Sequence, residues 1–152
     1  MVVGKIVRNG SFDIRRILIL WGPVLLWMAV IFMLSAQSGL GGQQWPPWLQ
    51  ALRKTGHVAE YAALGVLLGR ALLLTWCEKG SIERPSRSLL RQAWQLGVVL
   101  STLYAISDEF HQSFVPQRGA HIEDVMIDAL SATAALGIWF ILLNRRLTMS
   151  DR

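Results

Sequence analysis

Asp108 and Glu109 are adjacent carboxylates at the end of an apolar run, within the stretch LSTLYAISDEFHQSFVPQR. Two other apolar runs begin with groups of the same kind. These groups are His57, Glu60, Asp124 and Asp128. Carboxylates and imidazoles can transfer protons, hold metal ions or bind cationic groups. Ionisable side chains at lipid depth are costly and usually functional, so we expect these residues to form a site.

Helical spacing sorts the candidate residues into short polar stripes, because residues three or four apart lie on the same face of a helix. The stripes are His57, Glu60 and Tyr61; Asp108, Glu109, His111 and Gln112; and Asp124 and Asp128. Arg118 follows in SFVPQRGAH, where Pro116 and Gly119 favour a turn. Such a turn would fold the guanidinium back over the carboxylates.

Four apolar runs must position these stripes. Three of them, 17–36, 58–76 and 125–143, approach the roughly 20 residues that cross a bilayer as a helix. The run 93–107 is short, and it becomes long enough only if its helix continues through Asp108 and Phe110 to Phe114. The runs do not alternate apolar with polar residues, and an open sheet cannot satisfy its backbone in lipid. We therefore predict an all-α fold, a polytopic membrane protein with a bundle of four transmembrane helices.

Composition supports a membrane protein. Of the 152 residues, 53% are hydrophobic and 16% charged, and the mean hydropathy is +0.38; soluble domains carry roughly 25% charged residues. The net charge of +5 might suggest nucleic acid, but the basic residues are spread over the flanks of the apolar runs. Anionic lipid head groups suit them better, so we expect membrane lipids as partners and no nucleic acid.

The chain divides into a cytoplasmic amino-terminal segment (1–16), a transmembrane domain (17–143) and a cytoplasmic tail (144–152). The first apolar run is longer than the core of a typical signal peptide, so we expect it to be retained. Between the first two runs, WLQALRKTG can form a short amphipathic segment at the membrane interface, with Trp48, Leu49 and Leu52 toward lipid.

Lysine and arginine set the expected orientation, because they collect in the cytoplasmic loops of multi-pass proteins. The amino-terminal segment, the loop 77–92 and the tail are rich in them, whereas the two other connections are poorer. Both termini should then be cytoplasmic, and the polar ends of all four helices should meet at the outer face. Ser35, Gln37 and Ser38 end the first of these helices.

Three motifs together resemble the VanZ-like family of small integral membrane proteins. They are HVAEYAALGVLL at 57–68, LYAISDEFHQSFVPQR at 103–118 and DVMIDA at 124–129, with LSAQS at 34–38 beside them. Family members commonly read Pro-Gly-Arg where this chain has Pro116-Gln117-Arg118, and Asn and Gly where Asp128 and Ser131 stand. The resemblance implies a bacterial cytoplasmic membrane protein, and some members are associated with teicoplanin and glycopeptide resistance.

Several functions fit such a site. The first is a binding module for a cell-envelope lipid or lipid-linked intermediate. The second is a metal-dependent hydrolase or transferase acting on a lipid-linked phosphoryl or acyl group, in which the acids and His57 would hold a divalent ion. A proton- or ion-coupled transporter and a purely structural network of paired charges are the other two.

We favour the lipid-binding pocket and leave open whether a reaction follows. The candidate catalytic residues are Asp108, Glu109, His57 and Glu60. The candidate ligand-binding residues are Arg118, Gln112, Tyr61, Asp124 and Asp128. No cofactor is identified by the sequence; a divalent metal belongs to the enzymatic alternative, and the oligomeric state stays open.

Overall fold

The computed structural model describes residues 14–37, 46–77, 85–116 and 118–149. In this part of the chain there are four helices and no strands, which confirms the all-α prediction. The helices are α1 (Ile14–Ser35), α2 (Pro47–Trp76), α3 (Arg87–Gln112) and α4 (Ile122–Met149).

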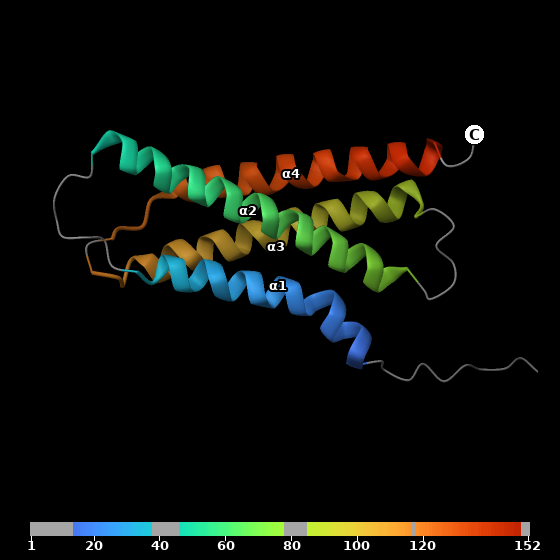
Figure 1. Cartoon of the computed structure of the whole chain (residues 1–152), viewed down its shortest axis with the longest axis horizontal. Helices are drawn as coiled ribbons and strands as arrows, with labels where there is room; N and C mark the ends of the chain where they lie inside the picture. Colours follow the sequence, from blue (N-terminus) through green and yellow to red (C-terminus); the bar gives the residue numbers. More distant parts are fainter. Residues whose placement is uncertain (1–13, 38–45, 78–84, 117, 150–152) are drawn as a thin grey trace, which may run out of the picture.

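The four helices lie side by side in one bundle (Figure 1). Helices α2 and α4 run in one direction along it, and α1 and α3 run in the other. The end of α1, the start of α2, the end of α3 and the start of α4 therefore gather at one end of the bundle. We call this end, which holds Ser35, His57, Asp108 and Asp128, the polar end.

Helix α3 continues through the adjacent acids, as the sequence predicted, but it ends at Gln112, two residues before Phe114. Its 26 residues span about 39 Å, enough to cross a hydrocarbon core. Small residues at intervals of four, Ala93, Gly97, Ser101 and Ala105, form its buried face, and Asp108 continues the same face. The inward direction of the acid is thus set by the helical period.

Helix α2 begins earlier than its apolar run. The stretch predicted to be a separate interfacial segment is helical, but from Pro47 it is continuous with α2. The apolar part of this helix that is long enough to cross a membrane is Lys54–Trp76, so the first turns precede it. The exposed indole of Trp48 suits a position at the membrane interface. Residues 38–45, the rest of this connection, lie outside the described part.

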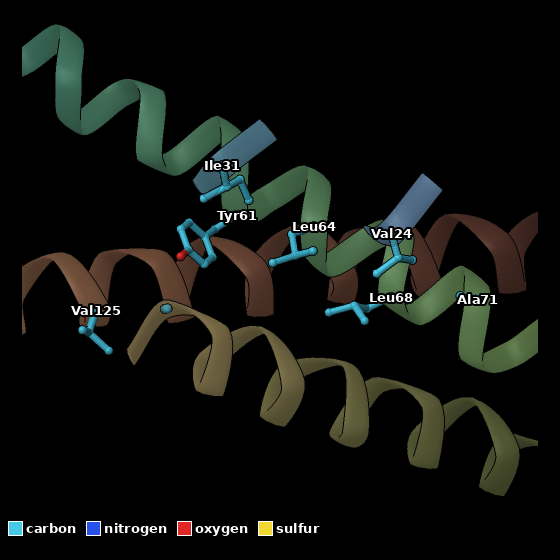
Figure 2. Packing of buried hydrophobic residues seen from close by; sticks show 8 residues of the cluster. Val24, Ile31, Tyr61, Leu64, Leu68, Ala71 and Val125 are labelled. Carbon is cyan, nitrogen blue, oxygen red and sulfur yellow. The ribbon is translucent and has the colours of Figure 1, made fainter. Parts of the chain in front are cut away.

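Two apolar clusters hold the bundle together. The first includes Val24 and Ile31 of α1, Leu64 of α2 and Val125 of α4. Figure 2 shows the members of this cluster distributed along the bundle, with Val125 at one end of the row and Val24 toward the other. The second cluster lies toward the other end of the bundle, which we call the apolar end. Its buried members are Leu72, Leu73, Ala93, Leu136 and Phe140.

Glycines let the helices approach closely at the apolar end. A methyl group added at Gly69 would lie 2.3 Å from Leu136 Cδ1, and one added at Gly97 would lie 2.8 Å from Leu136 Cδ2. Leu136 of α4 is therefore packed into two notches, one on α2 and one on α3. Such small-residue contacts are typical of helix packing in membranes.

Helices α1, α2 and α4 are each long and apolar enough to cross a membrane. Many large apolar side chains of the bundle are exposed, including Leu26, Phe110 and Leu130, each about two-thirds exposed. This outward apolar surface suits lipid rather than water as the surroundings. The chain is a helical membrane protein.

Candidate functional site

The polar end brings polar side chains from all four helices into the interior. Eight polar or charged residues are buried in the described part of the chain, and seven of them lie here. These seven are Ser35, His57, Asp108, Glu109, Gln112, Asp124 and Asp128. The eighth, Ser101, bonds to its own helix through Gly97 O. The predicted meeting of these acids and the His57 imidazole at one end is present in the structure.

A chain of hydrogen bonds links α1 to α3 and to the following loop. Ser35 Oγ donates to Asp108 Oδ2 at 2.9 Å, and Gln112 Nε2 donates to the same carboxylate oxygen at 3.0 Å. Arg118 Nη1 in turn donates to Gln112 Oε1 at 3.2 Å. The guanidinium is therefore connected to Asp108 through the amide of Gln112. The turn that brings it back includes the bond from Arg118 N to Val115 O.

His57 of α2 pairs with α4. Its Nδ1 lies 3.3 Å from Asp128 Oδ2, and both side chains are buried. The spacing along the sequence had grouped His57 with Glu60 and Asp128 with Asp124. Residues one turn apart on a helix share a face. The tip of a side chain that points into the bundle, however, lies closer to residues of the facing helix than to these neighbours. The contact between α2 and α4 therefore decides the partner of the imidazole.

Glu109 is turned toward the loop that precedes α4. The backbone N–H of His121 donates to Glu109 Oε2 at 2.8 Å. The side chain of His121 is exposed, and the residue type gives no indication of the contact that its backbone makes. Asp124, in the first turn of α4, is also buried near this carboxylate.

Several buried polar atoms of the site have no hydrogen-bond partner among the described residues. They are Tyr61 Oη, Asp108 Oδ1, Glu109 Oε1, His111 Nε2 and Asp128 Oδ1. Buried polar groups are usually bonded, and leaving one unbonded costs free energy. Such atoms, gathered at one end of the bundle, can form hydrogen bonds with a bound molecule.

Of the residues with unbonded atoms, Tyr61 and His111 lie in different surroundings. Tyr61 is fully buried in the apolar cluster of Figure 2, where its oxygen lies on the side of the ring away from Leu64. The ring of His111 stacks on Phe32 of α1, with 4.2 Å between ring centroids. Helical spacing grouped His111 with Asp108, although it was not one of the nine candidate site residues.

A pocket of about 400 Å³ lies in front of this network, between the end of α1 and the start of α2. Its lining residues are Leu34, Ser35, Gln37, Gly56, His57, Glu60 and Arg118. Ser35 and His57 are bonded to Asp108 and Asp128, so the two acids lie directly behind the lining. Leu34 and Gln37 are exposed at its rim.

The nine predicted site residues thus fall into two groups. His57, Glu60 and Arg118 line the pocket, whereas the other six, Tyr61, Asp108, Glu109, Gln112, Asp124 and Asp128, lie deeper or around it. Leu34, Ser35, Gln37 and Gly56 also line it, and of these only Ser35 and Gln37 were expected at this end. The sequence signals of Gly56 and Ser35 are modest: Gly56 precedes Glu60 by one helical turn, and Ser35 is a polar residue at the end of an apolar run.

A metal centre finds no geometric support in the described residues, where no three His, Cys, Asp or Glu side chains are placed to hold one ion together. The acids of the polar end point to different partners: Asp108 to Ser35, Glu109 to the loop and Asp128 to His57. This arrangement suits hydrogen-bond recognition better than coordination of a divalent ion.

The geometry agrees with the comparison against protein families. The family model described as VanZ/LLP1 matches residues 20–143, a stretch that includes the four helices' shared core and every residue of the pocket lining. Comparison with curated proteins found no match, and comparison with solved structures found none either. The chain belongs to the VanZ/LLP1 family.

Proposed function

We propose that this membrane protein binds the head group of a cell-envelope lipid, or of a lipid-linked molecule, in the pocket at the polar end. The observation that carries the proposal is the pocket itself. An imidazole, a carboxylate and a guanidinium, from His57, Glu60 and Arg118, face one space of about 400 Å³ at the end of an apolar bundle. A space of this size matches small-molecule sites, which measure roughly 300 to 1,000 Å³.

The surroundings of the pocket favour an amphiphile as the ligand. On α1, Phe32, Met33 and Leu34 are exposed just before the polar residues Ser35 and Gln37. A lipid could therefore place its head group in the pocket and its acyl chains along the outside of α1. A water-soluble ligand would leave this adjoining apolar surface unused.

The pocket residues have separate roles in the proposal. Arg118 contacts the phosphate or carboxylate of the ligand, since guanidinium groups form strong charge-assisted bonds with such anions. His57 and Glu60 contact the rest of the head group. Asp108 and Asp128 hold Ser35 and His57 in place through their hydrogen bonds.

We further propose that the polar end faces the outside of a bacterial cytoplasmic membrane and that both termini are cytoplasmic. The start of α1 and the end of α4 lie at the apolar end (Figure 1). Arg15 and Arg16 stand at the first of these, and Arg145 and Arg146 near the second. This accumulation agrees with the excess of basic residues in cytoplasmic segments. Binding of an envelope molecule at the outer face would give a route to altered glycopeptide susceptibility.

Transport is less well supported. A pathway for ions or protons needs polar groups through the depth of the bundle. Among the described residues, the buried polar side chains reach from the polar end only as far as Ser101. Beyond that level, the interior contains the apolar cluster around Leu136.

Native mass spectrometry of the protein extracted with its lipids tests the proposal. We expect stoichiometric lipid on the wild type and at least a severalfold loss in Arg118→Gln, because charge-assisted bonds contribute about 1.5 to 3 kcal/mol each. Lys54→Gln is the matched control: Lys54 is an exposed cation at the same end and does not line the pocket. Equal lipid occupancy in all three proteins would contradict the proposal. Lipid loss on adding a chelator would instead favour the metal-dependent alternative.

A further inference from the structure

We propose that the head group bound in the pocket is a zwitterion with a primary ammonium, as in phosphatidylethanolamine, whose ammonium donates hydrogen bonds to Glu60 while its phosphate lies against Arg118. The inference rests on the proposed lipid-binding function and names its ligand class. It comes from the charge of the site, from the carboxylate oxygens that have no partner, and from the space beside Gly56.

The charge of the polar end is unbalanced toward acids. Among its buried and pocket-lining side chains there are five carboxyl groups, those of Glu60, Asp108, Glu109, Asp124 and Asp128, and one guanidinium, that of Arg118. The His57 imidazole is already paired with Asp128. A ligand with only negative charge would be repelled by this surplus, whereas a ligand with an added cation would offset it.

Unpartnered oxygens show where that cation would be held. The Glu60 carboxylate lines the pocket and has no hydrogen bond or ion pair to any described residue; only its backbone oxygen is used, as the acceptor for Trp27 Nε1 at 2.9 Å. Behind it, Asp108 Oδ1 and Asp128 Oδ1 are buried and unpartnered. The site therefore presents hydrogen-bond acceptors, which require a donor.

The chemistry of the donors separates two common head groups. A primary ammonium is compact and offers three N–H donors. A quaternary ammonium has the same charge, but it is larger and offers none. Unpartnered carboxylate oxygens are satisfied only by the first, so the structure favours an ethanolamine over a choline head group.

Gly56 provides the room next to Glu60. It lies within α2, one turn before Glu60, and it lines the pocket. A methyl group added here would lie 4.0 Å from Glu60 Oε1. Glycine weakens a helix interior relative to alanine, so this position gives up helical stability and keeps the space beside the carboxylate open.

The experiment uses the full-length protein in vesicles that contain equal amounts of phosphatidylethanolamine, phosphatidylcholine and phosphatidylglycerol. After mild extraction, native mass spectrometry measures which lipid is retained. We expect phosphatidylethanolamine to be enriched about tenfold over each of the others, the ratio that corresponds to one charge-assisted hydrogen bond. Equal retention of phosphatidylcholine or phosphatidylglycerol overturns the inference but not lipid binding. No retained lipid at all overturns the proposed function as well.

Two variants test the placement of the ammonium. Gly56→Ala keeps every charge and favours the helix, so it should lower phosphatidylethanolamine retention severalfold without lowering the unfolding temperature. Gly22→Ala is the control, since an added methyl group there meets no atom within 4 Å. Glu60→Gln should reduce the preference over phosphatidylcholine to nearly one, whereas Glu123→Gln, at an exposed acid of α4, should keep it. Unchanged preference in Glu60→Gln overturns the inference.

Soluble O-phosphoethanolamine tests whether the pocket recognises the free head group or only the whole lipid. If it displaces the retained lipid, the pocket recognises the head group alone. If only the lipid is retained, the acyl chains along α1 are also required. Both results support the ammonium site, and displacement by phosphocholine with equal potency would contradict it.

Discussion

The two ends of the bundle differ in whether their polar groups are bonded within the protein. At the apolar end, Arg16 donates to Leu74 O at 2.7 Å and also to Cys77 O, and the indole of Trp21 donates to Thr75 Oγ1 at 3.1 Å. These bonds satisfy the end of α2, and the interior beside them is filled by Leu136 and its neighbours. At the polar end, three buried carboxylates each keep one oxygen without a partner in the described structure.

This difference between the two ends suggests that one contributes mainly to stability and the other mainly to ligand recognition. Unpartnered buried acids are poor stabilisers, and replacing buried ionic groups by neutral ones is often tolerated. Packing of small residues against large ones is what holds membrane helices together. We therefore expect the apolar end to contribute most of the free energy of unfolding and the polar end to contribute ligand binding.

The largest loss of stability should follow Leu136→Ala. In a membrane the removed side chain stays among apolar groups in the unfolded state as well, so the cost is mainly the cavity left between Gly69 and Gly97. We expect the free energy of unfolding, measured by denaturing-detergent titration in mixed micelles, to fall by about 2 kcal/mol. Leu142→Ala, at a half-exposed position of the same helix, should cost less than about 0.5 kcal/mol. A similar loss of unfolding free energy in both variants would contradict the idea that packing at the apolar end stabilises the bundle.

Arg16→Gln should come next. The guanidinium bonds to two carbonyl groups near the end of α2, and bonds to charged groups contribute about 1.5 kcal/mol or more. We expect a loss of about 1.5 kcal/mol in the same titration. Arg15→Gln removes the same charge from an exposed neighbour and serves as the control. If both variants lose the same unfolding free energy, the loss comes from the change in net charge and the bonds from Arg16 to the end of α2 contribute little.

Ser35→Ala should have a smaller effect. It removes the 2.9 Å bond to Asp108, but that oxygen keeps Gln112 as a donor. The expected loss is about 0.5 to 1 kcal/mol of unfolding free energy, with reduced lipid retention because Ser35 lines the pocket. Ser107→Ala, at an exposed serine of α3, should change neither quantity. A loss as large as that of Leu136→Ala would place a main source of stability at the polar end.

Asp108→Asn should change the unfolding free energy least, by less than about 0.5 kcal/mol, and stabilisation is the expected sign. The amide oxygen can still accept from Ser35 and Gln112, while the cost of a buried charge is removed. Lipid retention should fall in the same variant. If the acids were instead a structural pairing network, the substitution would cost about 3 kcal/mol or more. The titration therefore decides between recognition and a purely structural role.

Much of the fold was accessible from hydropathy and helical period. The four helices, the extension of α3 through Asp108 and the common end of the polar stripes follow from run lengths and from the alternation of helix direction. The start of α2 was placed too late, because Pro47 and the residues after it are polar enough to suggest a separate segment. Helix propensity there is satisfied by continuing one helix, with Pro in its first turn.

The sequence identified most members of the site but not which of them bond to one another. Residue type and spacing selected His57, Glu60 and Arg118, which line the pocket. The bond between His57 and Asp128 was not foreseen, since two residues 71 positions apart carry no periodic signal. Ser35 was expected at this end but not in the pocket lining, and Gly56 was missed, because the space beside Gly56 and the position of the Ser35 hydroxyl appear only when α1 and α2 are placed together.

The amino-acid sequence by itself determined that the chain forms four helices with their acids at one end, because helical period and hydropathy are local properties. Only the tertiary structure decided which acid meets the imidazole, which oxygens stay without a partner and where the pocket lies. These features depend on contacts between helices, and the sizes of facing residues such as Gly69, Gly97 and Leu136 set how closely the helices approach.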